Sequence, residues 1–252
     1  MLHFDEIVFG PIRSRRLGTS LGVNVLPTKG KLCNFDCIYC ECGWNKDGVS
    51  DKHFPSLADV EEALEKKLSE LSKAGTGIDS ITFSGNGEPT VNPDFAAIVD
   101  ATVRLRNIYC PSAKISVLSN ATMLGRKEVF DALKKVDNPI MKIDAASDQL
   151  VSAINKPQGM YSLERVIEGL EGFNGDFILQ TMFLHSDDFD AHTEEALEGW
   201  RNIVRRLRPR EVMVYTIDRE TPDKTLRKCK VEEMEVFVAP LKEEGFVIQV
   251  RG

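Results

Sequence analysis

The sequence predicts an α/β fold in which parallel strands are joined by helices, and three observations support this. After residue 75, short β-branched or apolar runs alternate with longer segments whose apolar residues recur at helical spacing. Polar and glycine-rich residues follow several of these runs, at 84–90, 119–121, 144–147 and 216–219. The 252 residues, 42% hydrophobic and 28% charged, suit one globular domain. Periodicity alone leaves open a doubly wound sheet and a closed or partial barrel.

Six runs are predicted to form the parallel sheet, and a seventh is predicted as a final strand. They span 22–26, 78–83, 114–118, 140–143, 177–183 and 211–217, with 246–250 at the end. Helices are predicted after Ser56, with Asp59 completing a capping box, after Asn92-Pro93 and after Ser162. Two later helices are indicated by apolar stripes within 197–207 and 234–241.

Charge and hydropathy indicate the compartment of the protein and the classes of partner that it can bind. It has no apolar run long enough for a membrane span and no basic-then-apolar start, so we expect a cytoplasmic protein without membrane partners. A net charge of -7 argues against a mainly electrostatic grip on nucleic acid. The basic run at 205–210 is interpreted as a solvated helix end.

Three cysteines stand close together after the first predicted strand. Cys33, Cys37 and Cys40 lie within eight residues, so their sulfurs can converge on one metal centre. A cubane cluster has four irons, and three cysteine ligands leave one iron open to a small molecule. A zinc site is the alternative, with Cys42, His53 or a remote residue as fourth ligand. A redox dithiol is a weaker alternative.

This CxxxCxxC motif, with Tyr39 before its last cysteine, resembles the signature of the radical S-adenosylmethionine (SAM) superfamily. The resemblance implies a partial (β/α)6 TIM-type barrel of parallel strands and one 4Fe-4S cluster whose open iron chelates SAM. It also implies reductive cleavage of SAM, hydrogen abstraction from a substrate, and an electron donor such as flavodoxin or ferredoxin. We expect a single domain over 1–252, with an amino-terminal extension (1–20), a barrel core (21–220) and a carboxy-terminal helix and strand (221–252).

Residues after later strands resemble the cofactor site of that superfamily. The segment 84–90 is similar to its Gly-Gly-Glu-Pro motif, although Asn86 separates the two glycines, so the resemblance assigns SAM binding to Gly85, Gly87 and Glu88. It assigns further cofactor contacts to Tyr39, through its backbone, and to Ser119, Asn120, Asp144 and Ile217. Ser119 and Asn120 could equally make ordinary turn hydrogen bonds.

The segments 9–24 and 215–219 resemble a bacterial and archaeal branch of Fe-S oxidoreductases related to wybutosine-synthesis enzymes that modify tRNA. Arginines can clamp a phosphate or carboxylate, so they are candidate substrate ligands, although they could instead pair with acids at the barrel mouth. The full candidate substrate set is Arg13, Arg15, Arg16, Lys142, Gln180 and Tyr215. The segment 155–157 is also predicted to reach the site, with its role open.

We therefore expect an oxidoreductase- or transferase-type radical SAM enzyme acting on a small molecule or an RNA nucleoside. A glycyl-radical activase, acting on a protein partner, is the alternative, and a non-enzymatic electron-transfer or metal-storage protein is a third class. Cys42, Cys110 and Cys229 are too scattered for an auxiliary cluster, so one cluster is predicted. Cys110 is interpreted as structural, whereas Cys42 lies near the cluster motif.

Overall fold

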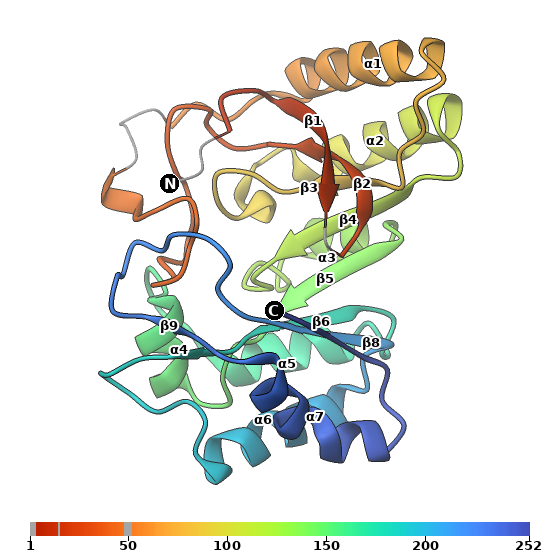
Figure 1. The fold of residues 1–252 in the computed structure, drawn as a ribbon. Helices are drawn as coiled ribbons and strands as arrows, with labels where there is room; N and C mark the ends of the chain where they lie inside the picture. The colour runs from red at the N-terminus through yellow and green to blue at the C-terminus, as the bar shows by residue number, and fades with distance from the viewer. Residues whose placement is uncertain (1–3, 15, 48–51) are drawn as a thin grey trace.

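The structure, a computed structural model, describes residues 4–14, 16–47 and 52–252. One eight-stranded sheet has the order β1-β2-β3-β4-β5-β6-β8-β10, so its strands follow one another across the sheet nearly as they do along the chain. Figure 1 shows this as a colour change from red at the top to blue at the bottom. All neighbouring pairs are parallel except β1 with β2. The curled sheet confirms the predicted partial barrel.

The strands of the main sheet are short, and most of their residues are buried. They are β1 (Val8–Ser14), β2 (Gly18–Val23), β3 (Ser80–Phe83), β4 (Lys114–Ser119), β5 (Asn138–Lys142), β6 (Ile178–Met182), β8 (Glu211–Tyr215) and β10 (Ile248–Arg251). A second, two-stranded antiparallel sheet pairs β7 (Leu184–His185) with β9 (Arg227–Lys228).

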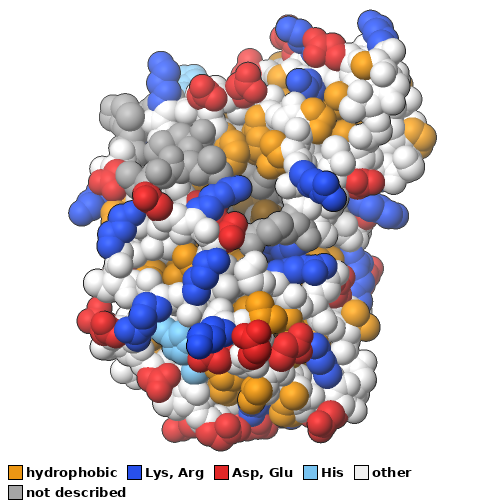
Figure 2. Space-filling model, in the orientation of Figure 1, with side chains coloured by type: hydrophobic (Ala, Val, Ile, Leu, Met, Phe, Trp, Pro, Cys, Tyr) orange, Lys and Arg blue, Asp and Glu red, His pale blue; other side chains and the backbone are white. Residues whose placement is uncertain are grey.

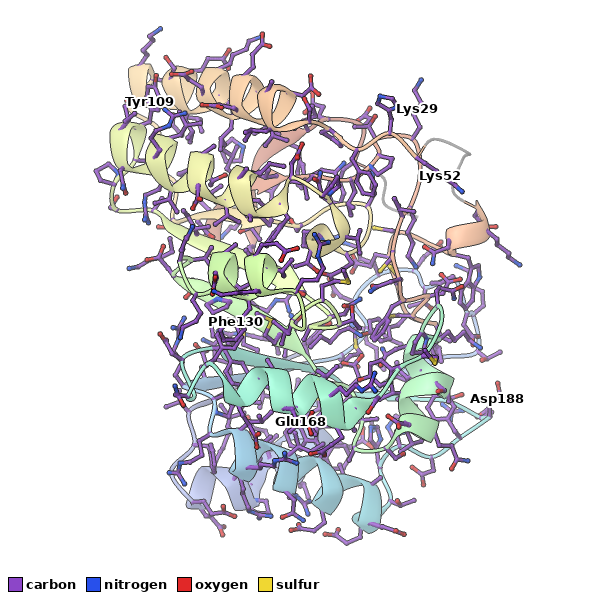
Figure 3. All side chains as sticks on the ribbon, turned by 180° about the vertical axis from the view of Figure 1, so that it is seen from behind. Lys29, Lys52, Tyr109, Phe130, Glu168 and Asp188 are labelled. Atoms are coloured by element: carbon purple, nitrogen blue, oxygen red, sulfur yellow. The ribbon has the colours of Figure 1, made fainter. Side chains whose placement is uncertain are left out.

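In the described residues, seven α-helices and two short 3-10 helices join the strands. They are η1 (Asn45–Asp47), α1 (Leu57–Lys73), η2 (Pro89–Val91), α2 (Phe95–Tyr109), α3 (Lys127–Leu133), α4 (Asp148–Asn155), α5 (Leu163–Glu171), α6 (Glu194–Leu207) and α7 (Val231–Glu243). Seen from behind, the helices lie one above another over the outer face of the sheet (Figure 3).

The hydrophobic core lies between the sheet and this helical layer. Leu21, Ile81 and Ile115 on three adjacent strands are fully buried, and Leu64 of α1 and Ile98 of α2 belong to the same cluster. Strands buried on both faces read as continuous apolar runs, which is why they were recognisable in the sequence. The helices supply apolar stripes at helical spacing, and the other sheet face is left for polar chemistry.

The residues predicted to cap helices are correct for α1 and α5 and wrong for α2. Ser56 caps α1 in a capping box with Asp59, and the Ser162 side chain caps α5, as predicted. The second helix does not start at Asn92, because that side chain donates to the carbonyl oxygens of Val25 and Pro55. Asn92 instead ends η2, and α2 begins at Phe95.

Other elements differ from the prediction for local reasons. The first parallel strand runs over Gly18–Val23 rather than 22–26, because the antiparallel partner β1 pairs with it from Gly18 onward. Helices α3 and α4 were not predicted, since seven or eight residues are too few to display a clear helical period.

The basic run at 205–210 forms surface ion pairs, as interpreted. Arg205 pairs with Glu198 and Glu244, and Arg210 pairs with Asp176. These pairs satisfy the cations at the end of α6 without a ligand. No helix in the described part of the chain combines the length and the apolar character needed to cross a bilayer.

Candidate functional site

The cysteine-bearing segment is a loop after β2, and backbone hydrogen bonds hold it against two other parts of the chain. The amides of Asp36 and Ile38 donate to the carbonyl oxygens of Asn155 and Ile154 at the end of α4. Phe35 also forms an isolated bridge with Pro157. The segment 155–157 therefore reaches the cysteines, as predicted, and it does so by shaping their loop.

The same loop is fixed on its other side by the glycine-rich turn after β3. Leu32 forms a parallel bridge with Gly87, and its amide donates to the Asn86 carbonyl oxygen at 2.8 Å. Gly87 has a φ of +139°, and a Cβ placed on it would lie 1.9 Å from the Leu32 carbonyl oxygen. Only glycine permits this approach. The 84–90 motif and the cysteine motif are thus packed into one unit.

Three donors point at the sulfurs of the loop. The Phe35 amide lies 3.4 Å from Cys33 Sγ, Asn155 Nδ2 lies 3.4 Å from Cys37 Sγ, and Lys142 Nζ lies 3.6 Å from it. Neither these cysteines nor any other described cysteine forms a disulfide. Hydrogen bonds to cysteine sulfurs stabilise thiolates and tune the potential of iron–sulfur clusters, so this donor set fits such a cluster.

A buried lysine supplies positive charge beside the loop. Lys31 Nζ donates to Asp36 Oδ1 and to the Gly43 carbonyl oxygen, each at 2.9 Å. Burial alone would lower the pKa of Lys31, but the charges of Cys40, Asp36 and Cys33 outweigh burial and raise it. Lys31 therefore remains a cation that can compensate thiolate charge.

The spacing of the three sulfurs bears on the zinc alternative. Among the described residues, the group whose possible ligand atoms all lie within 4.8 Å of one another is formed by His185, His192 and Cys229, and not by Cys33, Cys37 and Cys40. Thiolates on a single zinc ion sit about 2.3 Å from the metal and hence close together. A cubane binds each cysteine to a different iron, so its cysteine sulfurs need not lie as close together as those on one zinc ion.

Glu88 is a buried residue of the glycine-rich turn, and its carboxylate accepts hydrogen bonds from the end of β4. Its Oε1 accepts from the Thr90 hydroxyl at 2.5 Å and the Ser119 hydroxyl at 2.8 Å, and its Oε2 accepts from the Asn120 amide at 2.7 Å. Burial raises the pKa of Glu88, and these hydrogen bonds oppose that shift. The predicted cofactor residues Gly87, Glu88, Ser119 and Asn120 thus form one connected group.

Asp144, at the end of β5, joins four parts of the site. Its Oδ2 accepts from Tyr39 Oη at 2.5 Å, Asn155 Nδ2 at 2.6 Å and Lys142 Nζ at 3.0 Å, and its Oδ1 accepts from the Met182 amide at 3.0 Å. Burial would lower the pKa of Lys142, but the charge of Asp144 outweighs burial and raises it. Lys142 therefore remains a cation beside Asp144.

A cavity of about 520 Å³ lies between β1, the cysteine loop and the ends of β6 and β8. The predicted site residues that line it are Arg13, Arg16, Tyr39, Cys40, Gly85, Tyr215 and Ile217. Figure 2 shows Lys and Arg side chains gathered over the middle of this face. Cys42 also lines the cavity and donates to the Gly85 carbonyl oxygen at 3.5 Å.

Two of the predicted substrate residues are not part of the cavity wall, and a third lies outside the described residues. Gln180 is buried within β6 and pairs in register with Lys142, away from the lining. Lys142 reaches the sulfur of Cys37 instead of the cavity. Arg15 belongs to the part of the chain that the structure does not describe.

Sequence reasoning missed the parts played by Lys31 and Phe35. Lys142 Nζ lies 4.8 Å from the Phe35 ring centroid, which is a cation–π distance. Both residues stand within two positions of Cys33, and a lysine or aromatic residue inside a metal-binding loop is a signal that could have been used. The contact of Phe35 depends on Lys142, a residue more than a hundred positions away, which the sequence alone does not reveal, whereas Lys31 contacts the nearby Asp36 and Gly43.

We predict that Gly87→Ala destabilises the protein, because the added Cβ would overlap the Leu32 carbonyl oxygen. The expected loss is at least ~2 kcal/mol of unfolding free energy, measured by urea denaturation. Gly77→Ala is the matched control, since nothing lies within 4 Å of a Cβ at that position. Equal stability of the two variants would contradict the packing described for the cysteine loop.

Comparisons with known proteins agree with this geometry. Over 243 residues the chain is 29% identical to the UPF0026 protein MJ1312 of Methanocaldococcus jannaschii, covering 94% of this chain and 71% of that protein. It resembles in fold a radical SAM methyltransferase from Sphaerobacter thermophilus, with a TM-score of 0.69 and 17% identity. That match covers 92% of this chain and 65% of the methyltransferase chain.

A structure of TYW1 with a lysine-pyruvate adduct bound is similar in fold, with a TM-score of 0.61, 13% identity and coverage of 90% of this chain and 74% of that one. The family model of the radical SAM superfamily matches residues 28–198, which include the three cysteines and the glycine-rich turn. The chain therefore belongs to the radical SAM superfamily.

Proposed function

We propose that this enzyme binds a 4Fe-4S cluster through Cys33, Cys37 and Cys40, cleaves SAM reductively, and abstracts a hydrogen atom from an anionic substrate. Members of the superfamily generally bind such a cluster and SAM. The observation that carries the proposal is that the cysteine loop, the glycine-rich turn and a cavity lined by two arginines meet at one end of the sheet.

The cofactors supply the electron and the radical, and the chain's own residues position them and exclude water. Ile38 and Tyr39, which lie between the last two cysteines, are buried, so one side of the loop is shielded from solvent. Cys40 lines the cavity, whereas Cys37 faces Lys142 and Asn155. A cluster held there would have its protein-bound side stabilised by cations and its open side toward the cavity.

Glu88 is proposed to bind the ammonium group of SAM. The hydrogen bonds that it accepts from Thr90, Ser119 and Asn120 all come from uncharged donors. A buried carboxylate is costly unless a cation accompanies it, and an ammonium would provide that charge. Gly85 and Ile217 line the cavity beside the cysteine loop, whereas Glu88 is buried next to it, and this position supports the cofactor contacts predicted for Gly85 and Ile217.

Arg16 and Arg13 support an anionic substrate. Arg16 Nη1 is buried without a hydrogen-bond partner, and its guanidinium lies 4.7 Å from the centroid of the Tyr215 ring. Arg13 is exposed and lines the same cavity. An oxygen anion, a carboxylate or a phosphate, would satisfy the unpaired guanidinium nitrogen.

The substrate is proposed to be a small molecule or an RNA nucleoside carrying such an anion. Superfamily members typically need a reductant, and a flavodoxin or ferredoxin is the proposed electron donor. Whether the net reaction is an oxidoreduction or a group transfer follows from the fate of the substrate radical. The glycyl-radical activase alternative stays a prediction.

We predict that Cys37→Ala abolishes formation of 5'-deoxyadenosine, because it removes a cluster ligand. The measurement is anaerobic reconstitution with iron and sulfide, reduction in the presence of SAM, and chromatography of the nucleoside product. Cys110→Ala is the control, since Cys110 stands at the end of α2 and outside the cavity lining. Retained cleavage in Cys37→Ala would contradict the ligand assignment.

Glu88→Gln is expected to weaken SAM binding by ~10-fold or more while iron content stays at the wild-type level, because only the carboxylate charge is removed. Titration of the reconstituted protein with SAM measures the affinity. The matched control is Glu65→Gln on the exposed face of α1. An unchanged affinity with the cluster retained would exclude the proposed role of Glu88.

Arg16→Gln should weaken binding of an anionic probe by ~10-fold or more, since one charge-assisted hydrogen bond is lost. Inorganic phosphate is the probe, and calorimetric titration at matched ionic strength measures its affinity. Arg104→Gln serves as the control because Arg104 pairs with Glu61 at the surface. Equal phosphate affinity in wild type and Arg16→Gln would count against an anion subsite.

A further inference from the structure

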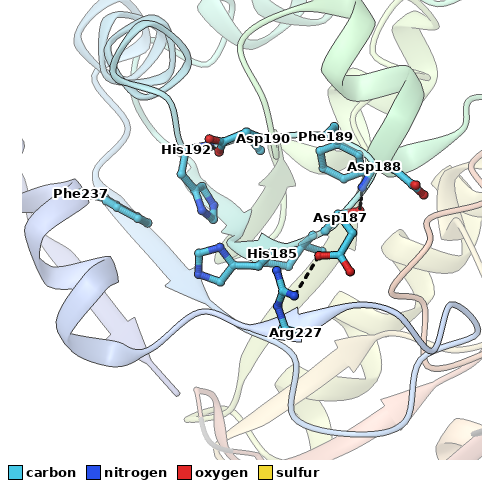
Figure 4. Close-up of a pocket in the computed structure, with 11 residues that line it drawn as sticks. His185, Asp187, Asp188, Phe189, Asp190, His192, Arg227 and Phe237 are labelled. Carbon is cyan, nitrogen blue, oxygen red and sulfur yellow. Dashed lines mark hydrogen bonds and ion pairs between the residues drawn. The ribbon is translucent and has the colours of Figure 1, made fainter.

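Two histidines and a cysteine outside the candidate active site converge on one point. His185 is in β7, His192 precedes the first turn of α6, and Cys229 lies between β9 and α7. One possible ligand atom from each lies within 4.8 Å of the other two. Figure 4 shows the two imidazole rings next to each other at the wall of a cavity of about 540 Å³.

The surroundings of His192 leave one of its ring nitrogens without a partner. Nε2 is buried and makes no hydrogen bond. The imidazole packs against Phe183 and Phe237, with ring centroids 5.5 and 4.8 Å away, and neither ring accepts a conventional hydrogen bond. A buried polar atom that stays unsatisfied costs free energy, and aromatic packing alone gives no reason for a histidine here.

A carboxylate supports the same cluster from α7. Glu233 Oε1 lies 3.3 Å from His185 Nε2, and Glu233 Oε2 lies 3.9 Å from Cys229 Sγ. The Lys230 amide donates to Oε2 at 2.7 Å and so fixes the carboxylate at the helix start. A carboxylate beside a metal-binding imidazole orients the ring and increases its basicity.

We propose that His185, His192 and Cys229 form a binding site for a single zinc ion. Two imidazoles and one thiolate are donors that suit Zn²⁺, and a fourth tetrahedral position would take a water molecule from the adjacent cavity. The thiol of Cys229 loses its proton to solvent when the metal binds. The cavity shares no lining residue with the one beside the cysteine loop, so this site is separate from the proposed SAM chemistry.

The ion would add a direct link between β7, the segment before α6 and the segment before α7, which already meet through aromatic packing and the His185–Glu233 pair. The β7–β9 sheet has only two residues in each strand, and Cys229 is anchored by the hydrogen bond from its amide to the Thr216 hydroxyl. A metal bound by all three side chains would tie this small sheet to the start of α6 and to α7. We therefore infer a mainly structural role for the ion.

The test uses the full chain with Cys33, Cys37 and Cys40 replaced by alanine, so that the other sulfur-rich loop cannot bind the probe. Zn²⁺ alone is titrated in competition with a chromogenic chelator. One zinc per chain is expected, and His192→Gln in the same background should weaken its affinity by more than about 100-fold. Cys110→Ala in that background should leave the affinity unchanged.

Thermal unfolding gives a second measurement that does not require a tight complex. Saturating zinc should raise the unfolding midpoint of the triple-alanine chain by roughly 5 °C and leave His192→Gln unaffected. With Co²⁺, the thiolate-to-metal absorption should disappear in Cys229→Ser. Absence of zinc binding, or equal affinity in His192→Gln, would overturn the site. Neither result depends on SAM cleavage, so the two proposals fail separately.

Discussion

The buried carboxylate of Asp144 is the interaction on which the arrangement of the site depends. It joins the cysteine loop through Tyr39, the end of α4 through Asn155, and β6 through the Met182 amide. Its ion pair with Lys142 is almost fully enclosed. Removing one partner of a buried ion pair costs about 3–5 kcal/mol, because the other charge is left uncompensated. The cysteine loop, although far away in sequence, therefore keeps one position relative to the sheet.

A steric constraint acts on the opposite side of the loop. Gly87 lets the Leu32 backbone approach so closely that no side chain fits between them. The Leu32 amide donates to the carbonyl oxygen of Asn86, the residue before Gly87. Asn86 is itself fully buried and donates to the Pro27 carbonyl oxygen at 2.9 Å. The asparagine between the two glycines is thus a structural anchor for the start of the cysteine loop. Its presence explains how this turn can depart from a Gly-Gly pair.

The sequence predicted the parallel sheet and the main residues of the site because both leave local signals. Buried strands are continuous apolar runs, and polar residues such as Glu88 and Asn120 follow them directly. The strand β1 left no such signal, since Pro11 and two exposed residues interrupt it. Nor could spacing reveal that Lys142 turns to Cys37 while Arg16 faces the cavity. Those directions depend on side-chain packing between residues distant in sequence.

The cations around the cysteine loop differ in whether an acidic side chain pairs with them. This difference indicates which of them can bind a ligand anion in the cavity. Lys31 and Lys142 are enclosed with Asp36 and Asp144, so each is already paired before any ligand binds. Their positive charge would balance the thiolates of a bound cluster, but neither lysine is free to hold a substrate. Among the residues that the structure describes, no acidic side chain pairs with Arg16, and its buried Nη1 has no hydrogen-bond partner. Because burying an unpaired donor is unfavourable, a ligand anion gains affinity there that it could not gain at either lysine.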